Sequence, residues 1–328
     1  MNALEQLAER SERGFPNLTA ARLRTAARLR EAQERLAEVP ADRDVCVALF
    51  GSWGRRELTD GSDDDWAVVV NGGGQVQVAP SLAQVRTVLG RGGQAPAAQG
   101  TFGDVVFCDH LVDRIGLDAD DNRNLTMRML LLLESVAVVN EEAHHACQSR
   151  VLDGYLDWSV KDYRPPRFFL NDLVRYWRTI CVDFVGKERE GSGQKWAIRN
   201  LKLGTSRKVL FASGLLPILF CHRYAATDIG PFLGRALRQP AVDRIAWAFI
   251  ELGAVDAGLR AIGAYDRFLG MIGDYAVRGE LEQLSRKEAQ GSAAFQEGRR
   301  LGAELEQGLL ALLFETRLEP LVREYGIF

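Results

Sequence analysis

Hydrophobic residues are arranged in two different patterns along the chain. In the first half, short apolar runs are bounded by turn residues, and runs of this length predict buried strands. The predicted strands cover 45–50, 65–70 and 105–108. Apolar residues at helical spacing between these runs predict helices. The predicted helices cover 18–38, 81–89 and 125–134. The first of them should present Leu23, Ala26, Leu29, Ala32 and Leu36 as one stripe and end before Pro40.

From about residue 162 the strand pattern almost disappears. The helices predicted there cover 168–185, 195–213, 242–252, 254–272, 279–301 and 303–318. Loops rich in Gly, Pro or polar residues are expected at 90–100 and 188–194. We therefore expect an α+β protein, with a mixed-sheet domain and its N-terminal helix over residues 1–155. An all-helical domain should cover residues 156–328.

The segment richest in candidate chemistry joins the first two predicted strands. Gly51-Ser52 follows the first strand, and Ser62-Asp63-Asp64-Asp65-Trp66 opens the second. Side chains two apart on a strand point to one face, so Asp63 and Asp65 should share a face and Asp64 should lie opposite. Paired carboxylates suit a divalent metal, and a Gly-Ser turn offers N–H groups and a hydroxyl to phosphate. The pattern predicts a site for a metal and a nucleoside triphosphate.

A Gly-Ser turn, a gap of about ten residues and Asp-x-Asp before an apolar strand together resemble the DNA polymerase β-like nucleotidyltransferase superfamily. One departure is Asp64, since the middle residue is often apolar in the family. The resemblance implies a mixed-sheet core and two Mg²⁺ ions held by three carboxylates and the triphosphate. It also implies transfer of a nucleoside monophosphate (NMP) from a nucleoside triphosphate (NTP) to a hydroxyl acceptor, with release of pyrophosphate. The segment 125–140 is similar to a helix that returns to the core in several bacterial members.

The resemblance further implies a third carboxylate on a later strand. Asp109, at the end of the run 105–108, is the first candidate, and Asp104, just before that run, is the second. Because the two are five positions apart, they would face opposite sides of a strand. Asp120 and Asp121 precede a predicted helix and are expected to cap it.

Cations and aromatic residues in the helical half form two clusters that are candidates for nucleotide binding. One is Arg175-Tyr176-Trp177-Arg178, and the other is Lys195, Trp196, Arg199, Lys202, Ser206, Arg207 and Lys208 on the next predicted helix. Lys195, Arg199 and Lys202 have the spacing of one helical face. In the superfamily a helical domain often supplies a Lys or Arg and a Ser to the triphosphate, a role that suits Lys202 and Ser206. Tyr176 or Trp196 could stack on the base; the alternative is solvated cations with the tryptophans in the core. In the turn, the residues expected at the nucleotide are Gly51, Ser52, Arg55 and Ser62.

Composition restricts the function less than the motif does. The 328 residues are 47% hydrophobic and 26% charged, and the net charge is −3, which is ordinary for a globular protein and disfavours long nucleic acid as the acceptor. A small molecule or a protein hydroxyl is the favoured acceptor. No run of about 18 apolar residues or N-terminal signal core is present, so we expect a cytoplasmic protein without a membrane partner. His144-His145 is expected at the surface.

Two other functions are compatible with the same sequence. One is a non-catalytic nucleotide-sensing or toxin–antitoxin-type interaction protein that keeps the fold without turnover. The other is a helical interaction module, supported only by the C-terminal half. The intact Asp63 and Asp65 pair favours the enzyme.

Overall fold

A four-stranded mixed sheet organises the N-terminal half of the computed structural model, which describes residues 1–11, 13–39, 42–72, 78–89, 102–157, 160–190 and 195–326. The strands are β1 (Val45–Phe50), β2 (Trp66–Val70), β3 (Val105–Phe107) and β4 (Ser135–Val139). The sheet order is β3-β2-β1-β4, with β2 parallel to β3 and the other two pairs antiparallel. The three predicted strands are confirmed, whereas β4 was not predicted.

The helices of this half are α1 (Ala3–Ala8), α2 (Pro16–Arg35), α3 (Ser52–Arg55), α4 (Ala79–Leu89), α5 (Cys108–Val112), α6 (Asn122–Leu133) and α7 (Glu141–Leu156). Both faces of the central strands are covered, because alternate residues of β1 enter two different hydrophobic clusters. One cluster joins Val45, Val47 and Leu49 to residues of α2 and α4. This double burial explains why the β1 and β2 segments read as unbroken apolar runs.

The buried face of α2 and the cap of α6 can be compared with the sequence prediction. The apolar stripe of α2 was right only in part: Ala32 and Leu36 are buried as predicted, whereas Leu23 is 69% exposed. The N-terminal part of the helix instead buries Leu18, Ala21 and Thr25. The helix ends at Arg35, and Pro40 lies outside the described residues, as does the expected loop at 90–100. The cap of α6 is Asp121, which accepts a hydrogen bond from the Asn124 backbone, as expected. Asp120, the other expected cap, instead pairs with Arg128 at 2.7 Å.

The C-terminal half consists of helices in the residues described. They are α8 (Arg167–Glu190), α9 (Trp196–Gly204), α10 (Ser206–Phe220), a 3₁₀ turn at Cys221–Arg223, α11 (Ala226–Leu237), α12 (Ala241–Glu251), α13 (Val255–Gly273), α14 (Tyr275–Gln283), α15 (Arg286–Ala289), α16 (Ala293–Phe314) and α17 (Glu319–Tyr325). The predicted helix at 195–213 is in fact two, interrupted at Thr205, and the one at 279–301 is divided among α14, α15 and α16. The helix α11 was not predicted. Of the loop expected at 188–194, residues 188–190 are the last turn of α8 and residues 191–194 lie outside the described part of the chain.

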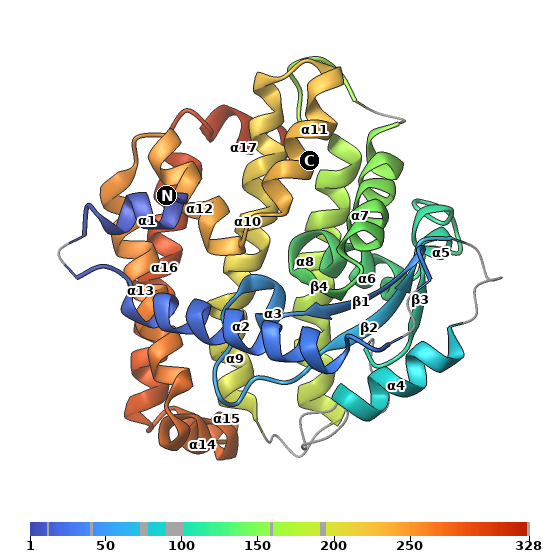
Figure 1. Ribbon diagram of the computed structural model, residues 1–328. Helices are drawn as coiled ribbons and strands as arrows, with labels where there is room; N and C mark the ends of the chain where they lie inside the picture. The colour runs from blue at the N-terminus through green and yellow to red at the C-terminus, as the bar shows by residue number, and fades with distance from the viewer. Residues whose placement is uncertain are drawn as a thin grey trace.

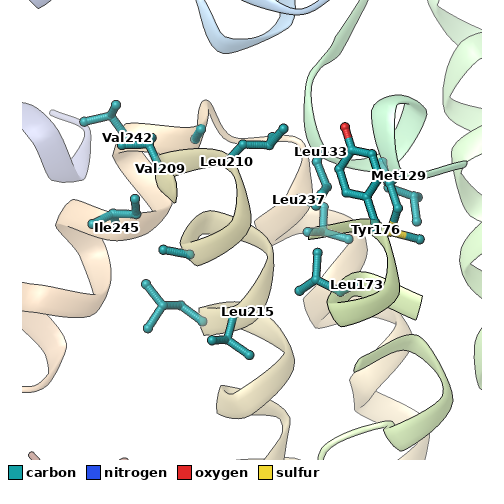
Figure 2. Packing of buried hydrophobic residues seen from close by; sticks show 14 of the residues in the cluster. Met129, Leu133, Leu173, Tyr176, Val209, Leu210, Leu215, Leu237, Val242 and Ile245 are labelled. Carbon is teal, nitrogen blue, oxygen red and sulfur yellow. The ribbon is translucent and has the colours of Figure 1, made fainter. Parts of the chain in front are cut away.

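The two halves share a hydrophobic core. In Figure 1 the sheet lies to the right and helices α12, α13 and α16 to the left, with α2 running between them. The N-terminal helix α1 packs against α12 and α13, and α2 packs against α13. Figure 2 shows Met129 and Leu133 of α6 near Leu173 and Tyr176 of α8, with Leu210 of α10 close by. The sheet and the C-terminal helices are therefore packed against each other around one core.

One helical stretch has the length and apolar composition that a membrane span requires. It covers Trp196–Arg223, from α9 through α10, and 72% of its most apolar window is buried inside the protein. A core helix meets the same criterion, so the stretch says little about location.

Candidate functional site

A cavity of about 110 Å³ lies where the loop between β1 and β2 meets the C-terminal helices. From the loop it is lined by Gly51, Ser52, Arg55, Glu57, Thr59, Gly61, Ser62, Asp63 and Asp65, and from the helices by Lys202, Ser206, Arg207, Leu269, Ile272 and Arg278. Larger hollows of about 450 and 1070 Å³ lie elsewhere on the protein. Arg175 and Arg178, from a cluster that the sequence also offered for substrate binding, line the hollow of about 450 Å³. Neither hollow contains a residue of the Gly51 to Asp65 motif, so we place the candidate site in the small cavity.

The turn after β1 depends on glycine at two positions. Gly51 has φ +65° and ψ −126°, a conformation that L-residues rarely adopt, and a Cβ there would lie 3.5 Å from the Asp65 carboxylate. Gly54 packs so closely on the backbone of Glu134 that a Cβ would come within 2.1 Å of it. The backbone N–H of Phe50 donates to the carbonyl of Asp65 at 2.8 Å. These contacts hold the turn and the second aspartate side by side.

The acidic pair has the predicted orientation. Asp63 and Asp65 both line the cavity and Asp64 does not. Asp64 is buried on the other side, where the Trp53 indole N–H donates to its carboxylate at 3.2 Å and Arg28 lies 3.7 Å away. Burial, together with the charge of Asp63, raises the pKa of Asp65 to about 6, against the opposing effect of Arg207. Because repulsion and desolvation penalise this carboxylate, a bound cation would relieve it.

Cations from the helical half face this pair. Lys202 lies near the end of α9, and Ser206 and Arg207 begin α10, so the break at Thr205 brings all three to the cavity wall. Burial, with smaller effects of Arg278 and Arg207, lowers the pKa of Lys202 to about 8. The Arg278 side chain lies so close to Gly61 that a Cβ there would be 2.6 Å from Nε.

Not all expected cations reach the site. Lys195 precedes α9 in a left-handed conformation, and its ammonium lies 4.0 Å from Glu282. Neither Lys195 nor Arg199 lines the cavity. The expectation that they share a functional face with Lys202 is therefore wrong: the first lies outside the helix, and only Lys202 turns to the loop.

Two buried carboxylates hold Arg55. Its Nε donates to Glu57 at 2.8 Å, and its Nη1 is paired with Glu134, whose side chain is fully buried. Glu134 also accepts from Arg207 at 3.2 Å, and the Tyr265 hydroxyl donates to Glu57 at 2.7 Å. The network fixes both guanidinium groups beside the cavity and neutralises much of the Arg55 charge.

Glu134 and Arg278 were not predicted at the site, whereas Arg207 belongs to the cation cluster that the sequence offered for substrate binding. A signal existed for the first of these, because Glu134 is a lone carboxylate that ends the apolar run 129–133. A charge in such a position is buried only if it is paired. Nothing comparable distinguished Arg278 from other helical cations.

The structure does not bring the expected third carboxylate to the pair. Since β3 runs parallel to β2 with Phe107 opposite Val70, Asp109 lies beyond the far end of β2 from Asp65. It belongs to α5 and pairs with Arg150 at 2.6 Å. Asp104 precedes β3 and is more than half exposed, with Arg86 and Arg123 each 4.0 Å away.

Among the residues that the structure describes, no group of three or more His, Cys, Asp or Glu could hold a metal ion. The protein ligands that the site offers are therefore Asp63 and Asp65. Mg²⁺ usually takes only one or two carboxylates, with phosphates and water completing its shell. The donor set fits a metal that arrives with a polyphosphate.

The two aromatic residues expected to stack on a base are buried in the core. Tyr176 and Trp196 are 3% and 8% exposed, and Trp196 packs on Phe184 and Phe295, so neither ring is accessible to a base.

His144 is buried rather than on the surface: its Nε2 lies 2.8 Å from the Ser135 hydroxyl, and burial lowers its pKa to about 3. The local sequence gave no sign of this, because β4, which supplies Ser135, was not predicted.

The arrangement can bind a metal-bound polyphosphate, with carboxylates on one wall, cations on the other and a glycine turn beside them. Comparisons with models of protein families, with curated proteins and with solved structures found no match. A function can therefore be proposed only from the residues of this cavity and their chemistry.

Proposed function

We propose that the protein is a Mg²⁺-dependent nucleotidyltransferase that moves an NMP from an NTP to a hydroxyl acceptor and releases pyrophosphate. The observation that carries the proposal is the meeting of Asp63 and Asp65 with Lys202 and Arg207 around one cavity beside the Gly51 turn. Its volume of about 110 Å³ is well below the several hundred Å³ of a pocket for a whole small molecule. Phosphates and ions suit that space, and the nucleoside would remain outside.

Each side chain has a role that follows from its place. Asp63 and Asp65 would hold the metal, which when bound neutralises phosphate charge and polarises the reacting phosphoryl group. The turn at Gly51 and Ser52 offers N–H groups and a hydroxyl to phosphate oxygens. Lys202, Ser206 and Arg207 bind the phosphates that leave as pyrophosphate, and the charges of Lys202 and Arg207 stabilise that leaving group. Arg55, held by two glutamates, contributes mainly to the shape of the wall.

One observation favours a second candidate, a nucleotide sensor without turnover. The described residues bring no third metal-binding carboxylate to Asp63 and Asp65. Such a protein would bind Mg²⁺ and NTP in the same cavity and release the nucleotide unchanged. The acidic net charge favours a small molecule or a protein over long nucleic acid as acceptor for the enzyme, or as partner for the sensor.

The test is label transfer from each of the four NTPs, labelled at the α-phosphate, with Mg²⁺ and with or without cell extract. The enzyme predicts transfer and pyrophosphate release that are lost in Asp63→Ala and in Asp65→Ala. Asp60→Asn is the matched control, because Asp60 lies in the same loop with its side chain 82% exposed and outside the cavity. Nucleotide binding without turnover of any NTP, with Mn²⁺ as well as Mg²⁺, would favour the sensor.

A further inference from the structure

Tyr275 is an unusually exposed aromatic residue next to the candidate site. Its relative exposure is 92%, the highest among the exposed large hydrophobic residues that the structure describes. It is the first residue of α14, and two residues that line the cavity flank it: Ile272 three positions before and Arg278 three positions after. Residues three apart on a helix are neighbours on its surface, so Tyr275 lies one turn from Arg278. Tyr275 does not itself line the cavity, but its backbone lies between two residues that do.

The backbone beneath this ring is well anchored. The Asp274 carboxylate caps α14 by accepting from the backbone N–H groups of Ala276 and Val277 at 2.9 and 3.0 Å. Gly273 lies against the loop, since a Cβ there would be 3.7 Å from Thr59, and Arg278 packs on Gly61. The start of α14 is thus held to the β1–β2 loop on both sides of Tyr275.

The ring itself has no partner of this kind. In the described part of the chain no hydrogen bond or ring contact is found for Tyr275. Exposing a tyrosine ring leaves a large apolar face in water, on a backbone that is already ordered. A flat ligand could stack on that face with little further loss of conformational entropy by the protein.

We propose that Tyr275 stacks on the base of the bound nucleotide and that the base is a purine. This inference rests on the proposed function, because the phosphates must occupy the cavity. The cavity is too small for the nucleoside, and the two aromatic residues expected to stack, Tyr176 and Trp196, are buried in the core. Stacking is worth about 1–3 kcal/mol per base by alanine substitution, and the larger purine ring covers more of a tyrosine than a pyrimidine does.

The test is calorimetric titration with Mg²⁺ and three probes: the α,β-methylene analogue of ATP, the same analogue of CTP, and inorganic triphosphate. Wild-type protein should bind the ATP analogue more tightly than the other two. Tyr275→Ala should weaken the ATP analogue roughly tenfold and leave triphosphate unchanged, and Tyr275→Phe should behave as wild type. Tyr163→Ala is the control, since Tyr163 is also exposed, at 63%, but lies outside the cavity lining.

The outcomes separate this inference from the proposed function. If wild type binds none of the three probes, the proposed function itself fails. If wild type binds them and Tyr275→Ala binds the ATP analogue as tightly, the stacking role is wrong. Equal weakening of triphosphate and of the ATP analogue would also overturn it, because Tyr275 would then act through Arg278 and not through the base.

Discussion

Replacing Asp65 with Asn should stabilise the ligand-free protein in a pH-dependent way. The pKa of this carboxyl is raised to about 6 from the usual aspartate value of about 3.9, first by burial and then by the charge of Asp63. A carboxyl whose pKa is higher in the folded state stabilises that state below the unfolded pKa, and the contribution is lost as pH rises through the folded pKa. With roughly 2 units between the two values, the full loss is about 3 kcal/mol at pH 8. About half of it falls between pH 5 and pH 8.

The measurement is the free energy of unfolding in urea, for wild type and Asp65→Asn, at pH 5 and pH 8 without nucleotide. On going from pH 5 to pH 8, the variant should gain about 1.4 kcal/mol relative to wild type. Asp60→Asn, in the same loop but exposed, should follow wild type at both values. An equal difference at the two pH values would refute the reasoning that burial and Asp63 penalise a charged Asp65. A binding site often lowers the stability of the ligand-free protein, because charges that the ligand would neutralise stay unpaired until it binds.

Four further outcomes are expected. Glu134→Ala should lower the free energy of unfolding by about 3–5 kcal/mol, because it leaves Arg55 with Glu57 as its one buried partner and removes the carboxylate that pairs with Arg207; a loss below 1 kcal/mol would contradict this. Gly51→Ala should cost about 1–3 kcal/mol in backbone strain in urea unfolding, whereas Gly72→Ala, with open space and no positive φ, should be nearly neutral. Because the pKa of Lys202 is lowered to about 8, the affinity for Mg²⁺-bound NTP should fall as pH rises through 8 in calorimetric titrations, and Lys202→Arg should remove that fall. Asp109→Asn should leave label transfer unchanged, and a transfer-dead variant would restore Asp109 as a candidate ligand.

The parts that could be predicted from the sequence are those in which the local pattern decides the outcome. The strands β1 and β2 were predictable because both faces are buried, which demands unbroken apolar runs. The orientation of Asp63, Asp64 and Asp65 followed from the alternation of side chains along an extended segment. Both depend on a few neighbouring residues and on nothing distant in the chain.

The rest depended on how distant segments pack. The run that forms β4 directly follows α6, and only its pairing with β1 makes it a strand. Asp109 was a reasonable third ligand until the parallel register of β2 and β3 placed it at the wrong end of the sheet. Helical spacing could not foresee the break at Thr205, which separates Lys202 from Ser206 and turns both toward the loop. Which of the many arginines reaches the cavity is likewise a property of the assembled fold.

The most direct test of the central claim is a crystal structure with Mn²⁺ and a non-hydrolysable NTP analogue, in which anomalous scattering locates the metal. We expect a metal peak within coordination distance of the carboxylates of both Asp63 and Asp65. We also expect the phosphates to contact Lys202 and Arg207 and the base to lie over Tyr275. A metal or a triphosphate bound elsewhere, with the cavity between the loop and α9 unoccupied, would contradict it.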